Sequence, residues 1–173
     1  MLEQLLMAGS GGQGIVLIGR ILASASVKSI PHLTFLPAYG AEVRGGTSNC
    51  QVILSSREIA SPVAEKFDSM IIMSQESADK FLPRKRGKCL TLINSSLCRV
   101  TGRTGGVAIG ATELAGELGD VCAANFIMLG AYLARKPVVQ PASVEECTRM
   151  VLAGRNKSLI DLNIRVFRVG LTQ

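Results

Sequence analysis

The apolar positions along the chain follow two periods, one typical of buried strands and one typical of helices. Residues 4–8 form a short apolar run, as in a buried parallel strand, and the apolar residues from Ile15 to about Ile30 recur at helical spacing. A glycine-rich turn separates these two segments, so they predict a strand followed by a helix. Further strands are predicted at 32–37, 47–55, 67–74, 88–96 and 105–112.

Helical spacing dominates the second half of the chain. Beyond the first unit, helices are predicted at 75–82, 114–136 and 143–162. Thr112 is the predicted cap of a helix that begins near Glu113, and the segment SVEE at 143–146 matches a capping box. Pro137 and Pro141 are expected to break the helical pattern between the last two helices.

Strands that alternate with helices indicate an α/β fold. We expect a three-layer sandwich, with a Rossmann-like, mostly parallel sheet flanked by helices. No composition shift, low-complexity segment or repeat divides the chain, so residues 1–173 are expected to form a single domain. The glycine-rich turn then lies at the carboxyl end of the first strand, where open α/β sheets place ligands.

The composition points to a subunit of a larger assembly. Charged residues make up 18% of the chain, below the roughly 25% of an average globular protein, so much of the surface is uncharged or covered by a partner. The first residues lack the basic and long apolar regions of a signal peptide, and the weakly polar stretch 123–134 is too short to span a bilayer. We expect a cytoplasmic protein with no membrane partner.

The net charge of +6 raises the question of nucleic-acid binding, with PRKRGK at 83–88 as the most basic segment. The chain has no Trp and only 4% aromatic residues, and stacking residues do not interleave with the basic ones. We therefore expect no nucleic-acid partner. The basic segment is interpreted as a solvated loop between two strands or as a docking face for an acidic partner.

The cysteines and the one histidine offer little chemistry of their own. The chain has an odd number of cysteines and no CxxC pair, which favours reduced thiols over disulfides: Cys50, Cys89, Cys98, Cys122 and Cys147. We expect no metal site and no iron–sulfur cluster held by this chain alone. Cys50 is interpreted as a core residue and His32 as a packing or capping residue, so no catalytic residue is predicted.

The glycine-rich turn matches the GxGxxG fingerprint of dinucleotide-binding domains through Gly9, Gly11 and Gly14. Such a domain also needs an acidic residue at the end of its second strand, and none stands near Thr34 to Leu36. There is no GxxxxGK[ST] pattern either. The candidate site on this turn comprises Gly9, Ser10, Gly11, Gly12, Gln13 and Gly14, in which the Gln brings a side-chain amide into the turn.

A second candidate loop follows the second predicted strand, in the segment AYGAEVRGG at 38–46. A carboxylate and a guanidinium lie there among three glycines, so both can sit close to whatever group the glycine backbone admits. The candidate residues are Tyr39, Gly40, Glu42, Arg44, Gly45 and Gly46. Since both loops follow the ends of early strands, we expect them to form one surface at the carboxyl edge of the sheet.

These motifs together resemble the gamma subunit of the 2-oxoacid:ferredoxin oxidoreductases. The resemblance rests on GSGGQGI at 9–15, PAYGAEVRGGTSNCQVILSSREIASP at 37–62 and SQESADKF at 74–81. ANFIMLGAYL at 124–133 and NIRVFRVG at 163–170 are similar to that family as well. The resemblance covers nearly the whole chain, and its most specific part is the glycine–Gln turn followed at this distance by YGxExRGG.

The resemblance implies a complex that converts a 2-oxoacid and coenzyme A to acyl-CoA, carbon dioxide and reduced ferredoxin. Alpha and beta partner subunits would hold thiamine diphosphate between them, with 4Fe-4S clusters in the beta or delta parts. This chain would bind no cofactor alone. Its two glycine loops would line the active-site entrance, with the phosphates of the co-substrate coenzyme A as a candidate ligand.

Several alternatives stay open at the level of sequence. The 2-oxoacid is open among 2-oxoglutarate, pyruvate, branched-chain oxoacids and indolepyruvate, with 2-oxoglutarate favoured by the look of a short separate gamma chain. An isolated NAD(P)- or flavin-binding oxidoreductase and a free-standing Rossmann-like regulatory module are the rival function classes. Self-association of the isolated chain, through surfaces meant for partners, is also open.

Overall fold

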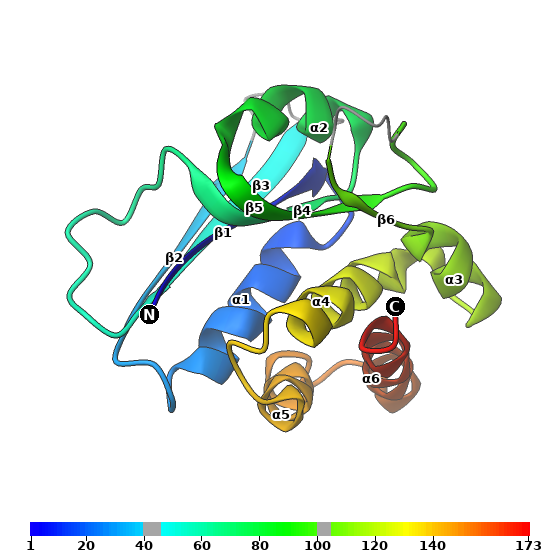
Figure 1. Ribbon diagram of the computed structural model, residues 1–173. Coiled ribbons are helices and arrows are strands. Elements are labelled where there is room, and N and C mark those ends of the chain that lie inside the picture. Colours follow the sequence, from blue (N-terminus) through cyan, green and yellow to red (C-terminus); the bar gives the residue numbers. More distant parts are fainter. Residues whose placement is uncertain (40–45, 100–104) are drawn as a thin grey trace.

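The computed structural model describes residues 1–39, 46–99 and 105–173. Its strands are β1 (Leu2–Ser10), β2 (His32–Tyr39), β3 (Thr47–Ser55), β4 (Phe67–Ile72), β5 (Lys85–Asn94) and β6 (Val107–Ile109). Its helices are α1 (Ile15–Ser26), α2 (Gln75–Phe81), α3 (Ala111–Glu117), α4 (Ala124–Arg135), α5 (Pro141–Val151) and α6 (Lys157–Gly170). Two short 3-10 turns, η1 (Leu82–Arg84) and η2 (Val121–Ala123), complete the described elements (Figure 1).

The described strands form one mixed sheet in the order β2-β3-β1-β4-β5-β6. The pairs β1–β4, β4–β5 and β5–β6 are parallel, whereas β3 is antiparallel to both β1 and β2. The predicted α/β class with a mostly parallel sheet is confirmed, and β3 is the exception to it. Only residues 40–46 join β2 to β3, too few for the crossover that a parallel pair requires, so these strands pair as a hairpin.

Helices cover the two faces of the sheet unequally. α1 and α4 pack against one face, with α5 outside α1 and α6 outside α4 (Figure 1). The main core lies between this face and the helices, and includes Leu5, Met7, Ile18, Leu22 and Phe126. On the other face, a smaller core of residues such as Leu6, Phe67 and Phe81 lies under the seven-residue α2. The second face therefore has much less helical cover than the first.

The backbones of α4 and α6 touch each other at two glycines. A Cβ added at Gly130 would collide with the carbonyl oxygen of Phe167, and one added at Gly170 would collide with the carbonyl oxygen of Ile127. Because glycine alone lacks this atom, the two helices approach more closely than other residues would permit. This contact gives a structural reason for the glycines in LGA and at the end of NIRVFRVG.

The ends of the last helices differ from the predictions. The segment 114–136 is divided between α3, η2 and α4, because Asp120 accepts a hydrogen bond from the backbone N–H of Cys122 (2.8 Å) and starts a new turn there. The segment 143–162 is divided between α5 and α6. Asn156 caps α6 by accepting from the backbone N–H of Ser158 (3.0 Å).

Three local predictions are wrong. α3 begins at Ala111, so Thr112 lies inside the helix, where its hydroxyl accepts a hydrogen bond from Asn94 Nδ2 (2.8 Å). The SVEE segment at 143–146 lies inside α5, because Pro141 occupies the first turn of that helix, where its fixed φ is favourable. The basic segment 83–88 is not a loop, since η1 ends at Arg84 and β5 begins at Lys85.

Candidate functional site

The glycine turn connects the end of β1 to the start of α1 at the carboxyl edge of the sheet (Figure 1). Gly12 and Gly14 have positive φ angles of 90° and 68°, a conformation that other residues rarely adopt. Gly14 is also the N-cap of α1 and provides no side-chain cap for the helix. The sequence therefore needs glycine at these two positions for the turn itself, whatever the turn binds.

Gln13 fills the inside of the turn with its side-chain amide. Its Oε1 accepts a hydrogen bond from the backbone N–H of Ser10 (2.7 Å), and its Nε2 donates to the carbonyl of Met73 (3.2 Å). The amide thereby ties the end of β1 to the residue that follows β4. Gly9 leaves room for it, because a Cβ there would collide with Gln13 Oε1 and would lie 2.9 Å from Met73 Cβ.

Asn125 supports the turn from α4. This side chain is 2% exposed, and its Nδ2 donates to the carbonyl of Gly14 (3.0 Å) while its Oδ1 accepts from the backbone N–H of Phe126 (2.9 Å). A Cβ at Gly14 would collide with the same Nδ2. Sequence reasoning did not assign Asn125 to the site. The one feature that marks this residue in the sequence is its polar amide within an otherwise apolar helical stretch.

Among the described residues, a backbone hydrogen bond joins the second glycine loop to the first. The N–H of Gly11 donates to the carbonyl of Gly46 (3.1 Å), so the structure brings these two predicted site residues together. Thr47, the next residue, accepts a hydrogen bond from Lys80 Nζ (3.2 Å). Tyr39 is 72% exposed at the end of β2. The other candidates in this loop, Gly40, Glu42, Arg44 and Gly45, lie outside the described residues.

Much of the hydrogen-bonding capacity of the turn is used within the protein. The N–H groups of Ser10, Gly11 and Gln13 donate to Gln13 Oε1, the Gly46 carbonyl and the Ser10 carbonyl respectively. A dinucleotide-binding turn instead directs such groups at a pyrophosphate. The geometry thus resembles a nucleotide turn, but neighbouring oxygens of the same chain accept these three bonds.

Cys50 and His32, the two residues considered for a catalytic role, lie in contrasting surroundings. Cys50 on β3 is fully buried, its thiol donates weakly to the carbonyl of Ile15 (3.5 Å), and burial raises its pKa to about 12. A thiol in this state is protonated at neutral pH and inert as a nucleophile, so the core assignment is confirmed. His32 is exposed at the start of β2, so the prediction that it packs is wrong, whereas the capping role stays a prediction.

No group of three or more His, Cys, Asp or Glu side chains among the described residues is arranged to hold a metal ion, and all five cysteines are free thiols. Within those same ranges, every helix is too short or too polar to cross a membrane. The site can offer shape, backbone contacts and polar side chains to a partner.

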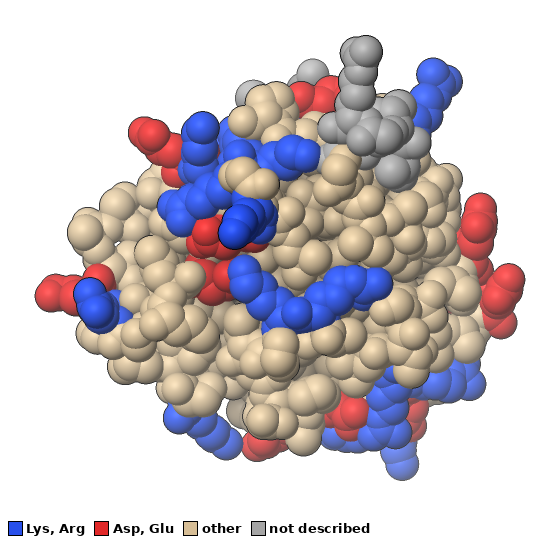
Figure 2. Space-filling model, in the orientation of Figure 1, with Lys and Arg blue, Asp and Glu red and all other residues tan. Residues whose placement is uncertain are grey.

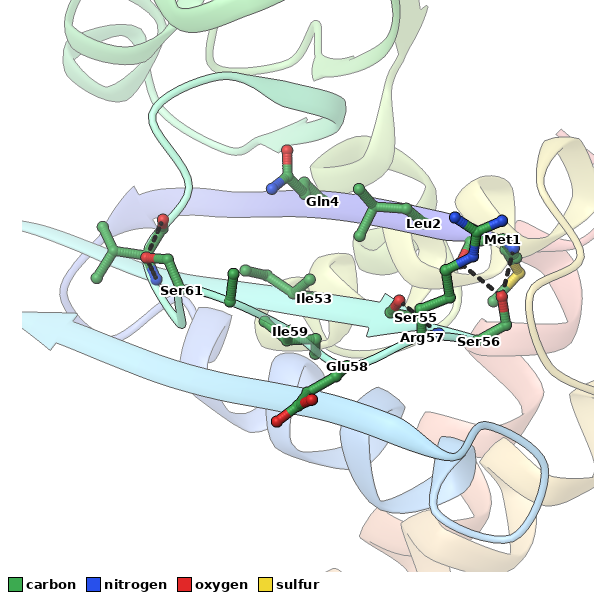
Figure 3. Close-up of a pocket in the computed structure, with 12 residues that line it drawn as sticks. Met1, Leu2, Gln4, Ile53, Ser55, Ser56, Arg57, Glu58, Ile59 and Ser61 are labelled. Atoms are coloured by element: carbon green, nitrogen blue, oxygen red, sulfur yellow. Dashed lines mark hydrogen bonds between the residues drawn. The ribbon is translucent and has the colours of Figure 1, made fainter.

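A pocket of about 550 Å³ opens at the other end of the same sheet (Figure 3). It is lined by the start of β1, the end of β3 and the segment that follows β3, including Leu2, Gln4, Ile53 and Ile59. None of the glycine-turn residues lines it. The hollow in Figure 3 and the glycine turn are therefore separate features of the molecule.

One family of known proteins matches nearly the whole chain. The family model described as pyruvate ferredoxin/flavodoxin oxidoreductase matches residues 4–173. Subunit VorA of the ketoisovalerate oxidoreductase of Methanothermobacter thermautotrophicus is 33% identical over 95% of this chain, which spans 35% of VorA. The chain thus corresponds to about a third of that longer relative.

Two solved structures are similar over nearly the whole chain. The gamma subunit of a keto/oxoacid ferredoxin oxidoreductase from Geobacter sulfurreducens is 26% identical, with a TM-score of 0.81 and coverage of 98% of this chain and 96% of that one. The 2-oxoglutarate:ferredoxin oxidoreductase from Magnetococcus marinus, solved with 2-oxoglutarate, coenzyme A and succinyl-CoA, has a TM-score of 0.89 at 19% identity. It shares the fold over 99% of this chain and 30% of its own.

Proposed function

The chain belongs to the pyruvate ferredoxin/flavodoxin oxidoreductase family, and we propose that it serves there as the gamma part of a 2-oxoacid:ferredoxin oxidoreductase. The proposed complex converts a 2-oxoacid and coenzyme A to acyl-CoA and carbon dioxide, and passes the electrons to ferredoxin. The family match over residues 4–173 is the observation that carries this proposal. The internally bonded glycine turn supports it, because that turn suits a contact surface better than a dinucleotide site.

The chemistry of the reaction is assigned to partner chains. We propose that alpha and beta subunits hold thiamine diphosphate, which would supply the decarboxylation chemistry, and that 4Fe-4S clusters in the beta or delta parts would accept the electrons. The role proposed for this chain is to contact the alpha and beta subunits and to line the entrance of their active site. Its buried thiol Cys50 and its exposed His32 are left without a catalytic part.

The two glycine loops are proposed to line the active-site entrance against the alpha and beta subunits. The contact between Gly11 and Gly46 supports a single surface, and Tyr39 stands exposed beside it. Arg44 is the proposed contact for a phosphate of coenzyme A, an expectation that rests on the sequence because Arg44 lies outside the described residues.

Arg44→Ala in the reconstituted complex should raise the coenzyme A concentration needed for half-maximal rate or weaken assembly. Unchanged turnover and association would contradict this role.

The substrate is proposed to be a 2-oxoacid, with 2-oxoglutarate and a branched-chain oxoacid first among the candidates. Relatives named as subunits of a ketoisovalerate oxidoreductase and of a 2-oxoglutarate synthase, 33% and 31% identical, support these two. The test is to assay the intact complex with 2-oxoglutarate, pyruvate, 2-oxoisovalerate and indolepyruvate, using a viologen as electron acceptor. Coenzyme A-dependent viologen reduction with one of the four is expected. A purified chain that brings no partner chains and instead binds a dinucleotide would overturn the proposal.

A further inference from the structure

A second surface lies at the amino ends of the parallel strands, at the opposite end of the sheet from the glycine turn. We call it the amino-edge surface and define it by Met1, Leu2, Val63, Arg86, Lys88 and Lys136. These residues come from the start of β1, the segment before β4, the start of β5 and the residue after α4. Figure 2 shows Lys and Arg side chains gathered over this face of the molecule.

Two of the carboxylates on this surface are already paired. Asp68 accepts from Arg86 Nη1 (2.8 Å), and Arg86 also donates to the side chain of Gln4. Glu3, which is 2% exposed, forms an ion pair with Lys136 and accepts a hydrogen bond from the Tyr132 hydroxyl (3.1 Å). Glu3 and Asp68 are thus each neutralised by a cation of the same chain, and the exposed Arg57 and Glu58, one base and one acid, line the 550 Å³ pocket.

Positive charge remains after these pairs are formed. Lys88 is exposed beside a pocket of about 380 Å³ that Glu3, Asp68 and Lys136 also line, and it has no ion-pair partner among the described residues. The surface therefore presents a net positive charge to its surroundings.

Apolar side chains adjoin this charge. Met1, Leu2 and Val63 are 60%, 53% and 51% exposed, and all three line the 550 Å³ pocket of Figure 3. Met1 and Leu2 also line the 380 Å³ pocket beside Lys88. An apolar centre next to a charged rim is the usual anatomy of a protein–protein interface. A nucleic acid would gain little from the apolar centre, whereas a protein segment that carries both an apolar and an acidic side chain can use both parts of the surface.

We propose that the amino-edge surface docks an acidic segment of a partner chain of the oxidoreductase complex. An apolar side chain of that segment enters the pocket beside Leu2 and Val63, and an adjacent Asp or Glu pairs with Lys88. This inference rests on the proposed function, because it takes its partner from the same complex. It adds a second contact surface, at the end of the sheet that the glycine turn does not reach.

The test measures the affinity of the chain for the remaining subunits of the complex at low and at high salt. Lys88→Glu should raise the Kd about tenfold at low salt, since it places like charges together, and the salt dependence of binding should weaken. Val63→Asp should weaken binding as well by inserting a charge into the apolar centre. Lys157→Glu, an exposed charge reversal at the start of α6, is the matched control and should bind like the wild type.

The outcomes separate this inference from the proposed function. If the wild-type chain assembles and Lys88→Glu binds as tightly as Lys157→Glu, the docking surface is wrong while the proposed function stands. If the wild-type chain binds no thiamine- or cluster-containing chain, the proposed function fails and the inference falls with it. Binding of the wild-type chain to anionic vesicles or to a DNA duplex, lost in Lys88→Glu, without any effect of that variant on assembly, would also overturn it.

Discussion

The two ends of the sheet differ in how they use their polar groups. At the carboxyl edge, neutral amides of Gln13 and Asn125 satisfy the backbone of the glycine turn from inside the protein. At the amino edge, charged side chains and exposed apolar residues surround open pockets. The end with the recognisable ligand motif is thus internally bonded, and the end without a motif has the features of a binding surface. A fingerprint such as GxGxxG therefore predicts the backbone conformation of a turn more directly than it predicts a bound ligand.

The largest expected effect concerns Gly14 and tests how tightly the turn is built. Gly14→Ala should lower the free energy of unfolding by roughly 3 kcal/mol, because it combines left-handed backbone strain with a collision against buried Asn125. Gly12→Ala is the control: its φ is also positive, but its Cβ would meet open space, so only the backbone strain should remain, at about 1 kcal/mol. Urea denaturation measures both. Equal losses would show that Asn125 does not brace the turn.

The next effect tests the buried ion pair under the amino-edge surface. Lys136→Met leaves the Glu3 carboxylate without its cation and should destabilise the fold by roughly 2 kcal/mol, less than for a fully buried pair because Lys136 is 35% exposed. Adding Glu3→Gln should recover most of this loss. A double variant whose destabilisation equals the sum of the two single losses would show that the pair is not coupled.

A smaller effect is expected from the amide inside the glycine turn. Gln13→Met keeps the length of the side chain but removes its bonds to Ser10 and Met73, which should cost roughly 1–2 kcal/mol of stability. Gln173→Met, at the far end of the chain, is the control and should have little effect. Thermal denaturation distinguishes them. Wild-type stability in Gln13→Met would mean that the turn holds its shape without this amide.

At neutral pH the last effect vanishes; it appears only at alkaline pH and follows from Cys50. Its thiol has a pKa of about 12 in the fold, above the ordinary value of 9.0, so folding favours the protonated form. The unfolded chain loses this proton first, and stability therefore falls as the pH rises from about 9 toward 12, by at most about 1.4 kcal/mol per pH unit. In Cys50→Ala the decline between pH 9 and pH 11 should be shallower. Identical slopes in urea titrations would contradict the shift.

Sequence reasoning found the elements whose signals are local. The apolar alternation at 47–55 coincides with β3, and the run at 4–8 lies within β1. The glycine and Gln positions of the turn were also identified from their spacing. Helix ends were less accurate, because side-chain caps such as Asp120 and Asn156 decide them one residue at a time.

Features assembled from distant segments could not be predicted in the same way. Asn125 reaches the turn across more than a hundred residues of chain, and no local pattern marks that contact. Likewise, Glu3 and Lys136 meet only because α4 packs against β4, the strand that pairs with β1. The basic segment 83–88 was recognised as a docking candidate, but the apolar residues beside it become neighbours only once the sheet has formed.

The central claim is that the glycine turn is a contact surface of a subunit and not a nucleotide site. Hydrogen–deuterium exchange tests it most directly, when the isolated chain is compared with the chain in the assembled complex. The amides of residues 9–19 are predicted to exchange about tenfold more slowly in the complex, because partner chains cover the turn. Exchange at these residues that is unchanged by assembly, yet slowed by NAD or FAD in the isolated chain, would contradict the account.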